Sequence, residues 1–154
     1  MELYLAQHAE SKSKEEDPGR GLTDDGFANI RKTARFAKKI NLTVDTIYHS
    51  DKLRAKQTAN ELAKSIKTIT GLNQRDNLAP MEDISSTREE IQMSNKNLMI
   101  VGHLPFLDKL ATALLCGNEE QKVVSFQYGC IVKLVRNDET KAWSIKWMII
   151  PDIC

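Results

Sequence analysis

The chain has 154 residues, of which 41% are hydrophobic and 28% are charged, a composition typical of a globular protein with a full core. Its 22 Lys and Arg residues nearly balance its 21 Asp and Glu residues, so the formal net charge is +1. Proteins that neutralise nucleic-acid phosphates normally carry a basic excess, so no nucleic-acid partner is expected. No apolar run approaches the ~20 residues that span a bilayer, so no membrane partner is expected. We predict a single domain over residues 1–154.

The N-terminal segment and the three cysteines bear on the cellular location. The segment from Met1 to Leu5 lacks the basic region and the apolar core of a signal peptide. Cys116, Cys130 and Cys154 are odd in number and widely spaced, which favours neither a disulfide framework nor a Cys-x-x-Cys metal site. These observations predict a reducing, cytoplasmic location.

The first part of the chain predicts two strands, each followed by a helix. Residues 3–6 form a short apolar run typical of a buried strand, and a polar loop follows over residues 9–22. A helix is predicted over residues 23–40, where the first residue is a threonine suited to the N-cap position. Residues 44–48 are β-branched and aromatic and predict the second strand. A second helix then runs from residue 51 to about residue 66.

The middle of the chain contains its clearest buried strand. Residues 71–94 are polar and irregular, with one short helix predicted over residues 87–93. Residues 97–101 are predicted to be a fully buried strand. Pro105 suits the first turn of a further helix, which is predicted to end at Gly117.

Two apolar runs close the chain, from Val123 to Val135 and from Trp143 to Ile150. They flank a turn-forming segment and predict an antiparallel pair of strands. Trp143 and Trp147 lie four residues apart, so we expect both rings on one face. Strands that alternate with helices and end in a hairpin predict an α/β fold, a three-layer sandwich with a mostly parallel mixed sheet.

Three chemically active side chains are expected at one edge of this sheet. Reactive groups gather at the carboxyl ends of parallel strands. His8 follows the first strand, His103 follows the buried strand over residues 97–101, and Arg54 lies in the opening turn of the second helix. Helix N-termini at this edge offer unpaired N–H groups that bind anions. Two histidines and an arginine in this setting indicate phosphate chemistry with a histidine nucleophile.

Four motifs carry a family resemblance, and they occur in the family's order and spacing: Gln7-His8-Ala9, Asp17-Pro18-Gly19-Arg20-Gly21-Leu22-Thr23, Ser50 with Arg54-Ala55 and Gln57-Thr58-Ala59, and Val101-Gly102-His103-Leu104-Pro105. On these motifs the chain resembles the histidine phosphatase superfamily (phosphoglycerate mutase-like), and most closely its small SixA-like phosphohistidine phosphatase branch. The resemblance covers nearly the whole chain. It implies the histidine phosphatase fold without a large lid.

The resemblance also implies roles for individual residues. His8 attacks phosphorus and becomes phosphorylated, while Arg54 and His103 hold the phosphoryl oxygens. Gln7 and Leu104 complete the implied phosphate site, and neither a metal ion nor an organic cofactor is implied. The implied function is a phosphatase that removes phosphate from phosphohistidine in a signalling or phosphocarrier protein, such as a phosphotransfer domain. A small phosphorylated substrate is the alternative partner.

Two positions depart from the family pattern. The family's first arginine is Gln7 here, which keeps N–H donors but loses the charge. Charged hydrogen bonds are worth ~1.5–3 kcal/mol against ~1 kcal/mol for neutral ones, so the expected cost is about tenfold to a hundredfold in rate. Ala9 replaces a glycine, which strains the loop only if the backbone there needs a positive φ. A weakly active or inactive phosphate-recognition module is therefore one alternative, and a small-molecule phosphomonoesterase is another.

The proton donor is left open among three carboxylates. Larger members of the superfamily place an acid after the middle strand, which implies Glu82 here, with Asp83 and Glu10 as alternatives. A labile P–N bond to imidazole needs less help from an acid than a bond to an alkoxide, so a weak acid favours phosphohistidine. The excursion over residues 71–94 leaves no room for a large lid, and an open site suits a protein substrate.

Overall fold

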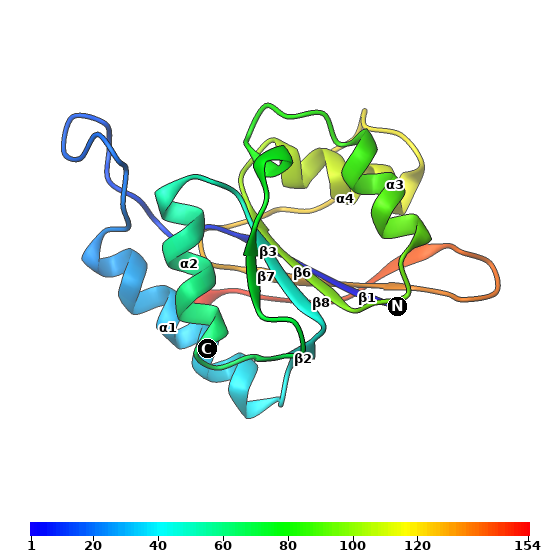
Figure 1. The fold of residues 1–154 in the computed structure, drawn as a ribbon, viewed down its shortest axis with the longest axis horizontal. Coiled ribbons are helices and arrows are strands. Elements are labelled where there is room, and N and C mark those ends of the chain that lie inside the picture. Colours follow the sequence, from blue (N-terminus) through cyan, green and yellow to red (C-terminus); the bar gives the residue numbers. More distant parts are fainter.

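Six strands form one sheet with helices on both faces in the computed structural model, which describes residues 1–154 (Figure 1). The strands are β1 (Glu2–Gln7), β2 (Thr43–Val44), β3 (Thr46–His49), β4 (Lys67–Thr68), β5 (Leu72–Gln74), β6 (Leu98–Gly102), β7 (Ile131–Arg136) and β8 (Trp143–Ile149). The helices are α1 (Asp24–Lys39), α2 (Leu53–Ala63), α3 (Ser85–Met93) and α4 (Phe106–Cys116), with the short 3-10 helices η1 (Asp76–Leu78) and η2 (Pro151–Ile153).

The strand order in the main sheet is β5-β3-β6-β1-β7-β8. β5, β3, β6 and β1 are parallel, whereas β7 is antiparallel to both of its neighbours, β1 and β8. The predicted three-layer sandwich with a mostly parallel mixed sheet is therefore confirmed. β2 and β4 form a separate parallel pair. Only η1 and α3 lie between β5 and β6, so the fold has no large lid, as predicted.

Alternating side chains of the central strands contribute to two hydrophobic cores, one on each face of the sheet. In β1, Leu3 and Leu5 belong to the core with α3 and α4, whereas Tyr4 and Ala6 belong to the core with α1 and α2. Parallel strands covered by helices on both faces are apolar along nearly their whole length, as β1 and β6 are. Each fully buried leucine contributes ~1.5–3 kcal/mol, so the double core fixes the ends of these strands.

Local interactions explain where α1 begins and where α4 ends. The Thr23 hydroxyl accepts a hydrogen bond from the N–H of Gly26 at 2.9 Å, which is the predicted N-cap. α4 ends at Gly117, whose φ of 81° is a left-handed conformation that glycine adopts at little cost. A Cβ at Gly26 would lie 2.2 Å from the carbonyl oxygen of Glu10. Only glycine at this position therefore lets α1 pack against the loop that follows β1.

The predicted strands differ from the structure in several places, and β4 is among the strands that the prediction lacks. The strand predicted over residues 44–48 is divided at Asp45 between β2 and β3, which pair with different neighbours. The strand predicted over residues 123–135 begins only at Ile131, because Gly129, with a φ of 73°, keeps the preceding segment in a loop. β5 is absent from the prediction, because most of its side chains are exposed and polar and backbone pairing with β3 alone defines it.

Trp143 and Trp147 lie on opposite faces of the sheet, so the prediction that they share a face is wrong. Trp143 belongs to the core with α4, whereas Trp147 packs against the core with α1 and α2. The register of β8 against β7 shifts between Lys133 and Leu134, which leaves Lys146 as an extra residue in β8. Such a β-bulge interrupts the two-residue alternation of a strand, so side chains four residues apart point in opposite directions.

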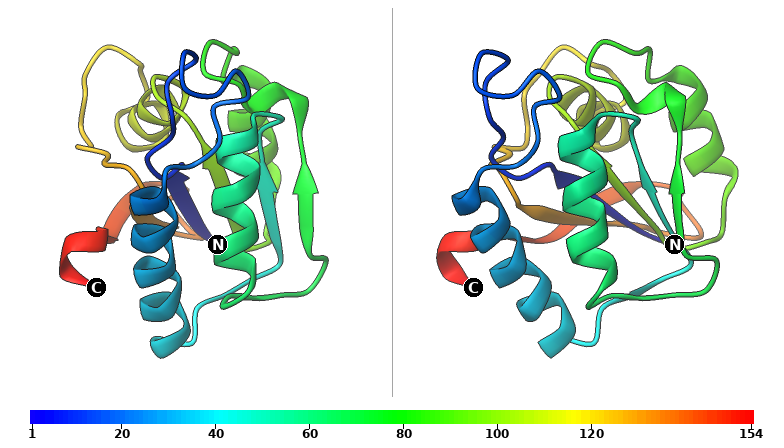
Figure 2. Two further views of the ribbon diagram at one scale, coloured as in Figure 1. Left: turned by 90° about the vertical axis from the view of Figure 1, so that its left-hand side faces the viewer. Right: turned by 60° about the vertical axis from the view of Figure 1, so that its left-hand side comes forward.

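The carboxyl ends of β3, β6 and β1 meet at one edge of the sheet, because these three strands are parallel and adjacent. The loop over residues 9–22 and the loop that follows η1 lie at this same end of the molecule (Figure 2). The residues that follow the three strands are therefore brought together. None of the helices combines the length and the hydrophobicity that crossing a bilayer requires.

Candidate active site

His8 is the first residue after β1, and its ring is held in a defined orientation. Its backbone N–H donates to the Gly102 carbonyl of β6 at 3.0 Å. The ring Nδ1 lies 2.7 Å from the carbonyl oxygen of Ala9, and because a carbonyl only accepts, Nδ1 carries the ring proton. Nε2 then has a free lone pair, which accepts a hydrogen bond from Nε of Arg54 at 3.3 Å. The nitrogen that can act as a nucleophile therefore faces a guanidinium group.

His103 follows β6 and lies beside His8, with 5.0 Å between the ring centroids. Its Nε2 is 2.5 Å from the hydroxyl oxygen of Ser50, which follows β3. The structure thus brings together His8, Arg54 and His103, the three groups that the sequence assigns to one site. Nδ1 of His103 is buried without a hydrogen-bond partner. Unpaired buried polar atoms are rare, and a bound ligand is one way to satisfy them.

Both histidines are neutral at pH 7 in the folded protein. Burial lowers the pKa of His8 to about 4, with a further contribution from the charges of Arg54 and Arg20. Burial likewise lowers the pKa of His103 to about 3, and the neighbouring His8 and Arg54 act in the same direction. The positive charge at the site therefore comes from the two arginines. A neutral imidazole with a free lone pair is the reactive form of a histidine nucleophile.

Thr58 connects the loop after β1 to α2. Its hydroxyl accepts a hydrogen bond from the N–H of Ala9 at 3.0 Å and donates to the carbonyl of Arg54 at 2.8 Å. One buried side chain thus fixes the backbone beside His8 relative to the backbone of the arginine. Ala9 has no positive φ, and its methyl group is buried in the core with α1 and α2. The replacement of the family's glycine by alanine therefore causes no backbone strain.

Gln7 and Leu104 are the other two positions predicted to bind phosphate. Gln7 is only 6% exposed, lines a hollow of about 350 Å³ together with Tyr128, and has no partner for its Oε1. The backbone N–H of Leu104, between β6 and α4, makes no hydrogen bond within the chain. Unpaired N–H groups at the start of a helix are suited to bind an anion. Both positions therefore keep a polar group without a partner, and each directly precedes or follows a histidine of the site in the chain.

The three candidate proton donors have different surroundings. The carboxylate of Glu10 accepts a hydrogen bond from the Thr23 hydroxyl at 3.5 Å, at the start of α1. Asp83 accepts a hydrogen bond from Ser85 N–H at 2.8 Å, and its interactions with Ser85 lower the pKa of this carboxyl. Glu82 is exposed, and its carboxylate has no hydrogen-bond or ion-pair partner. None of the three is bonded to the histidines or to the arginine of the site.

Two residues near the nucleophile are absent from the sequence prediction of the site. The ring of Tyr128, which is 53% exposed, lies 5.4 Å from the ring of His8. Arg20 lies close enough for its charge to lower the pKa of both His8 and Arg54. The position of Arg20 within a family motif is the one sequence feature that could have identified it. Tyr128 lies in a segment predicted to be a strand, and nothing in its pattern indicates a site.

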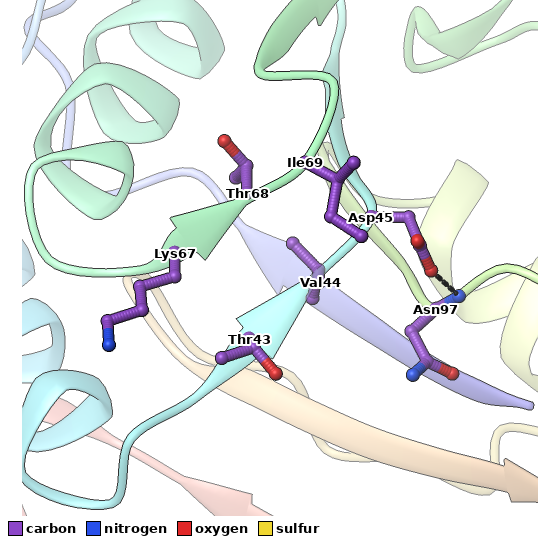
Figure 3. Close-up of a pocket in the computed structure, with 7 residues that line it drawn as sticks. All are labelled: Thr43, Val44, Asp45, Lys67, Thr68, Ile69 and Asn97. Atoms are coloured by element: carbon purple, nitrogen blue, oxygen red, sulfur yellow. Dashed lines mark hydrogen bonds between the residues drawn. The ribbon is translucent and has the colours of Figure 1, made fainter.

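A separate hollow of about 230 Å³ lies at the amino ends of the strands (Figure 3). Asn97 N–H donates to the carboxylate of Asp45 at 2.6 Å, and Asp45 N–H donates to the carbonyl of Asn97 at 2.7 Å. The side-chain oxygen of Asn97 also accepts the N–H of Glu2 at 2.7 Å. These polar groups are bonded to one another, and no histidine, arginine or cysteine lines the hollow. No group of three or more His, Cys, Asp or Glu side chains in the chain has metal-binding geometry.

The chain belongs to the histidine phosphatase superfamily. Residues 3–82, more than half of the chain, match the family described as histidine phosphatase superfamily (branch 1). This match includes His8 and Arg54, and the second histidine of the site lies beyond it. No curated protein sequence matches the chain.

Solved structures support the same fold over the whole chain. The protein histidine phosphatase SixA complexed with tungstate is 22% identical, with a TM-score of 0.86 and 99% of both chains covered. The putative phosphohistidine phosphatase SixA from Agrobacterium tumefaciens is 20% identical, with a TM-score of 0.75 and 97% of both chains covered. A putative alpha-ribazole-5'-P phosphatase from Escherichia coli str. K-12 substr. MG1655 is 15% identical, with a TM-score of 0.69 and 98% of both chains covered. At these identities the likeness establishes the fold.

Proposed function

We propose that this protein is a phosphatase that acts through a phosphohistidine intermediate on His8 and removes phosphate from phosphohistidine in a signalling or phosphocarrier protein. One observation carries the proposal. The Nε2 lone pair of a neutral His8 lies 3.3 Å from Nε of Arg54, so a nucleophile and a positively charged group meet at one point. A phosphoryl group bound there has the attacking atom on one side and a cation beside its oxygens.

The reaction has two steps. In the first, Nε2 of His8 attacks phosphorus, a P–N bond forms, and the leaving group departs with its electron pair and takes up a proton. The ring becomes positively charged, and the carbonyl of Ala9 stabilises the proton on Nδ1. In the second step, water attacks phosphorus and loses a proton, the P–N bond breaks, and the electron pair returns to Nε2. Inorganic phosphate leaves, and water is the only co-reactant consumed.

The neighbouring residues stabilise the transferred phosphoryl group in this proposal. Arg54 binds its equatorial oxygens, where negative charge spreads in the transition state. His103 and the backbone N–H of Leu104 add further hydrogen bonds. Gln7 offers an amide where the family has a guanidinium, which costs about tenfold to a hundredfold in rate relative to an arginine. A loss of this size lowers the rate of the proposed reaction but does not abolish catalysis.

Glu82 is the proposed proton donor to the leaving group. Its exposed carboxylate has no partner in the chain, whereas Asp83 is bonded to Ser85 and Glu10 is bonded to Thr23. A well-placed general acid increases the rate by ~10²–10⁴-fold. A proton donor that is not held at the site before the substrate binds gives a smaller rate enhancement. Imidazole leaves readily from a P–N bond, so a phosphohistidine substrate tolerates this better than a phosphate ester does.

The openness of the site supports a protein as the source of that phosphohistidine. A large lid that closes over a small molecule has no counterpart between β5 and β6. One similar structure is described as a protein histidine phosphatase, which is the same substrate class. Another is described as a putative phosphatase of a small molecule, so a panel of small phosphorylated compounds belongs in the test.

The proposal is tested by incubating the purified protein with a phosphotransfer domain phosphorylated on histidine and measuring phosphate release. We expect turnover by the wild type, and a loss of at least about 10³-fold for His8→Ala. His8→Asn is the matched variant, since its amide can still bind the carbonyl of Ala9 without offering a nucleophile, and it should be equally inactive. Rapid quenching of the wild type with ³²P-labelled substrate should trap acid-labile, alkali-stable label on the enzyme itself, separated by size from the labelled domain, and His8→Asn should carry none.

Two outcomes would replace this proposal by an alternative. Fast turnover of small phosphate esters without turnover of the phosphorylated domain would identify a small-molecule phosphomonoesterase. Binding of the domain without any turnover would identify a phosphate-recognition module. In that case Gln7→Arg should raise activity from the background, because it restores the charge that the family carries at this position.

A further inference from the structure

A third hollow, of about 320 Å³, adjoins the active site and is lined by four cationic side chains: Lys14, Arg20, Lys52 and Arg54. Two of them come from the loop over residues 9–22, and two come from the start of α2 and the residue before it. Arg54 lines this hollow and is also part of the active site, because its Nε contacts Nε2 of His8. An anion in this hollow would therefore lie next to a phosphoryl group bound at His8.

The cations of this hollow are largely without counter-charges. Lys52 pairs with Asp51 at 2.8 Å, and the other three cations form no ion pair. Asp17 lies on the same loop, but its carboxylate is occupied, accepting the N–H groups of Gly19 and Gly21 at 2.9 and 2.8 Å. No acidic residue lines the hollow. The result is a local excess of positive charge on a chain whose formal net charge is only +1.

The loop that carries two of these cations is fixed to the body of the protein. The N–H of Leu22 donates to Oε1 of Gln57 on α2 at 2.7 Å, and a β-bridge joins Ser11 to Leu22. Lys12 N–H donates to the Gly21 carbonyl at 2.9 Å. Arg20 itself adopts a φ of 52°, and its N–H is bonded to Asp17 at 2.8 Å. The loop is therefore a built part of the site.

The charge of this hollow acts on the catalytic groups. Arg20 contributes to the lowered pKa of His8 and to the lowered pKa of Arg54, in both cases after burial. Like charges interact in this way only when they are close together or poorly screened. The loop therefore brings Arg20 within electrostatic reach of the phosphoryl position.

We propose that this hollow is a second anion site, which binds acidic side chains that flank the phosphohistidine on the substrate protein. This inference rests on the proposed function, since it assigns the surroundings of the phosphorylated histidine. Lysines bind as point charges on flexible stems and impose no fixed fork geometry, which suits carboxylates at variable positions on a protein surface. The hollow thus selects acidic substrate faces and increases their rate of association.

The test uses binding and needs no turnover. Two peptides carry the same non-hydrolysable phosphonate analogue of phosphohistidine, one flanked by glutamates and one flanked by glutamines, and their affinities are measured by fluorescence anisotropy. We expect the wild type to bind the acidic peptide about fivefold to tenfold more tightly at low salt. The preference should diminish at high salt, because the pairs are exposed.

Two charge-matched double variants separate this site from a general charge effect. Lys14→Gln with Lys52→Gln should abolish the preference for the acidic peptide, while the affinity for the neutral one, which depends on the phosphonate, should fall to a smaller extent. Lys38→Gln with Lys39→Gln removes the same charge from exposed positions at the far end of α1 and should keep the preference. Equal binding of both peptides by the wild type, or a preference that persists without Lys14 and Lys52, would overturn the inference.

The outcome is independent of the phosphate-release assay. A protein that prefers the acidic peptide but releases no phosphate from the phosphorylated domain retains the second anion site and loses the proposed catalytic function. A protein that releases phosphate but treats both peptides alike retains the function and loses the site.

Discussion

The carboxyl and amino ends of the parallel strands in the central sheet each have a hollow lined by polar groups. The two ends differ in whether those groups are hydrogen-bonded to one another. At the carboxyl end, His8, Arg54 and His103 converge, and no carboxylate is bonded to any of them. At the amino end, Asp45 and Asn97 are bonded to each other and to the start of β1. The carboxyl end therefore brings a histidine nucleophile and an arginine together with groups that have no partner, whereas the polar groups of the amino-end hollow bond one another.

The difference shows where this fold accepts a cost in stability. Buried polar groups are normally paired, because an unpaired one costs roughly 1–3 kcal/mol. Oε1 of Gln7 and Nδ1 of His103 are buried and unpaired, and both lie at the carboxyl end. Perturbed titratable groups cluster at functional sites for the same reason. At the amino end, the bonds that join Asp45, Asn97 and Glu2 contribute to stability.

After loss of the His8 nucleophile itself, removal of the Arg54 charge gives the largest effect expected at the carboxyl end. We expect Arg54→Gln to lower kcat by ~10²–10³-fold, because a fixed donor to the phosphoryl oxygens is lost. Arg35→Gln, which removes an exposed arginine of α1 that forms no ion pair, is the control and should leave kcat unchanged. A loss of less than about threefold in Arg54→Gln would remove the distinction between the two ends.

The proton affinity of His8 tests the electrostatics of the carboxyl end. The pKa of about 4, against the ordinary 6.5, means that the folded protein binds this proton more than ~100-fold more weakly than the unfolded chain. The unfolded chain takes up the proton first on acidification, so the free energy of unfolding should fall as the pH decreases from about 6.5 to about 4. NMR titration of the ring Cε1–H gives the midpoint directly, and a midpoint near 6.5 would contradict a buried, neutral nucleophile.

Thr58→Val should show how far the catalytic end depends on its supporting hydrogen bonds. The change keeps the shape of the side chain but leaves the N–H of Ala9 and the carbonyl of Arg54 without their common partner. We expect kcat to fall about tenfold with little change in KM, because the nucleophile and the arginine lose their relative alignment. Thr58→Ser restores the hydroxyl and should recover the activity. Equal activity of the two variants would mean that Thr58 acts by packing alone.

The smallest effect on activity is expected at the amino end. Asp45→Ala removes the acceptor of Asn97 N–H and should lower the free energy of unfolding by ~1–3 kcal/mol. The activity per folded molecule should not change, since the hollow there contains no catalytic group. Urea denaturation and steady-state kinetics on the same preparation measure both quantities. A loss of activity at unchanged stability would show that the amino end takes part in function.

Much of the fold follows from local patterns in the sequence. The helix start at Thr23 and the helix end at Gly117 follow from capping, which depends on a few neighbouring residues. The strands β1 and β6 follow from continuous apolar runs. By contrast, β5 and the opposite faces of Trp143 and Trp147 depend on how strands pair, which no local pattern contains.

The candidate site was predictable to the extent that topology alone positions it. Parallel strands bring their carboxyl ends to one edge, so the meeting of His8, His103 and Arg54 follows from the order of strands and helices. The contact of Tyr128 with His8 could not be predicted, because Tyr128 lies in a loop where the sequence predicts a strand. Arg20 lies within a family motif, but its position beside the site depends on a loop that is bonded to α2. Only the three-dimensional structure shows that Asp83 accepts a hydrogen bond from Ser85, whereas the exposed carboxylate of Glu82 has no partner.

The sequence by itself therefore determined the family, the layered fold and the residue types at the sheet edge, because motifs, capping and apolar periodicity act over short distances. The tertiary structure alone decided the protonation of the two histidines, the tautomer of His8 and the positive hollow beside it. Burial, bond direction and the sum of nearby charges depend on groups that are distant in the chain and adjacent in space.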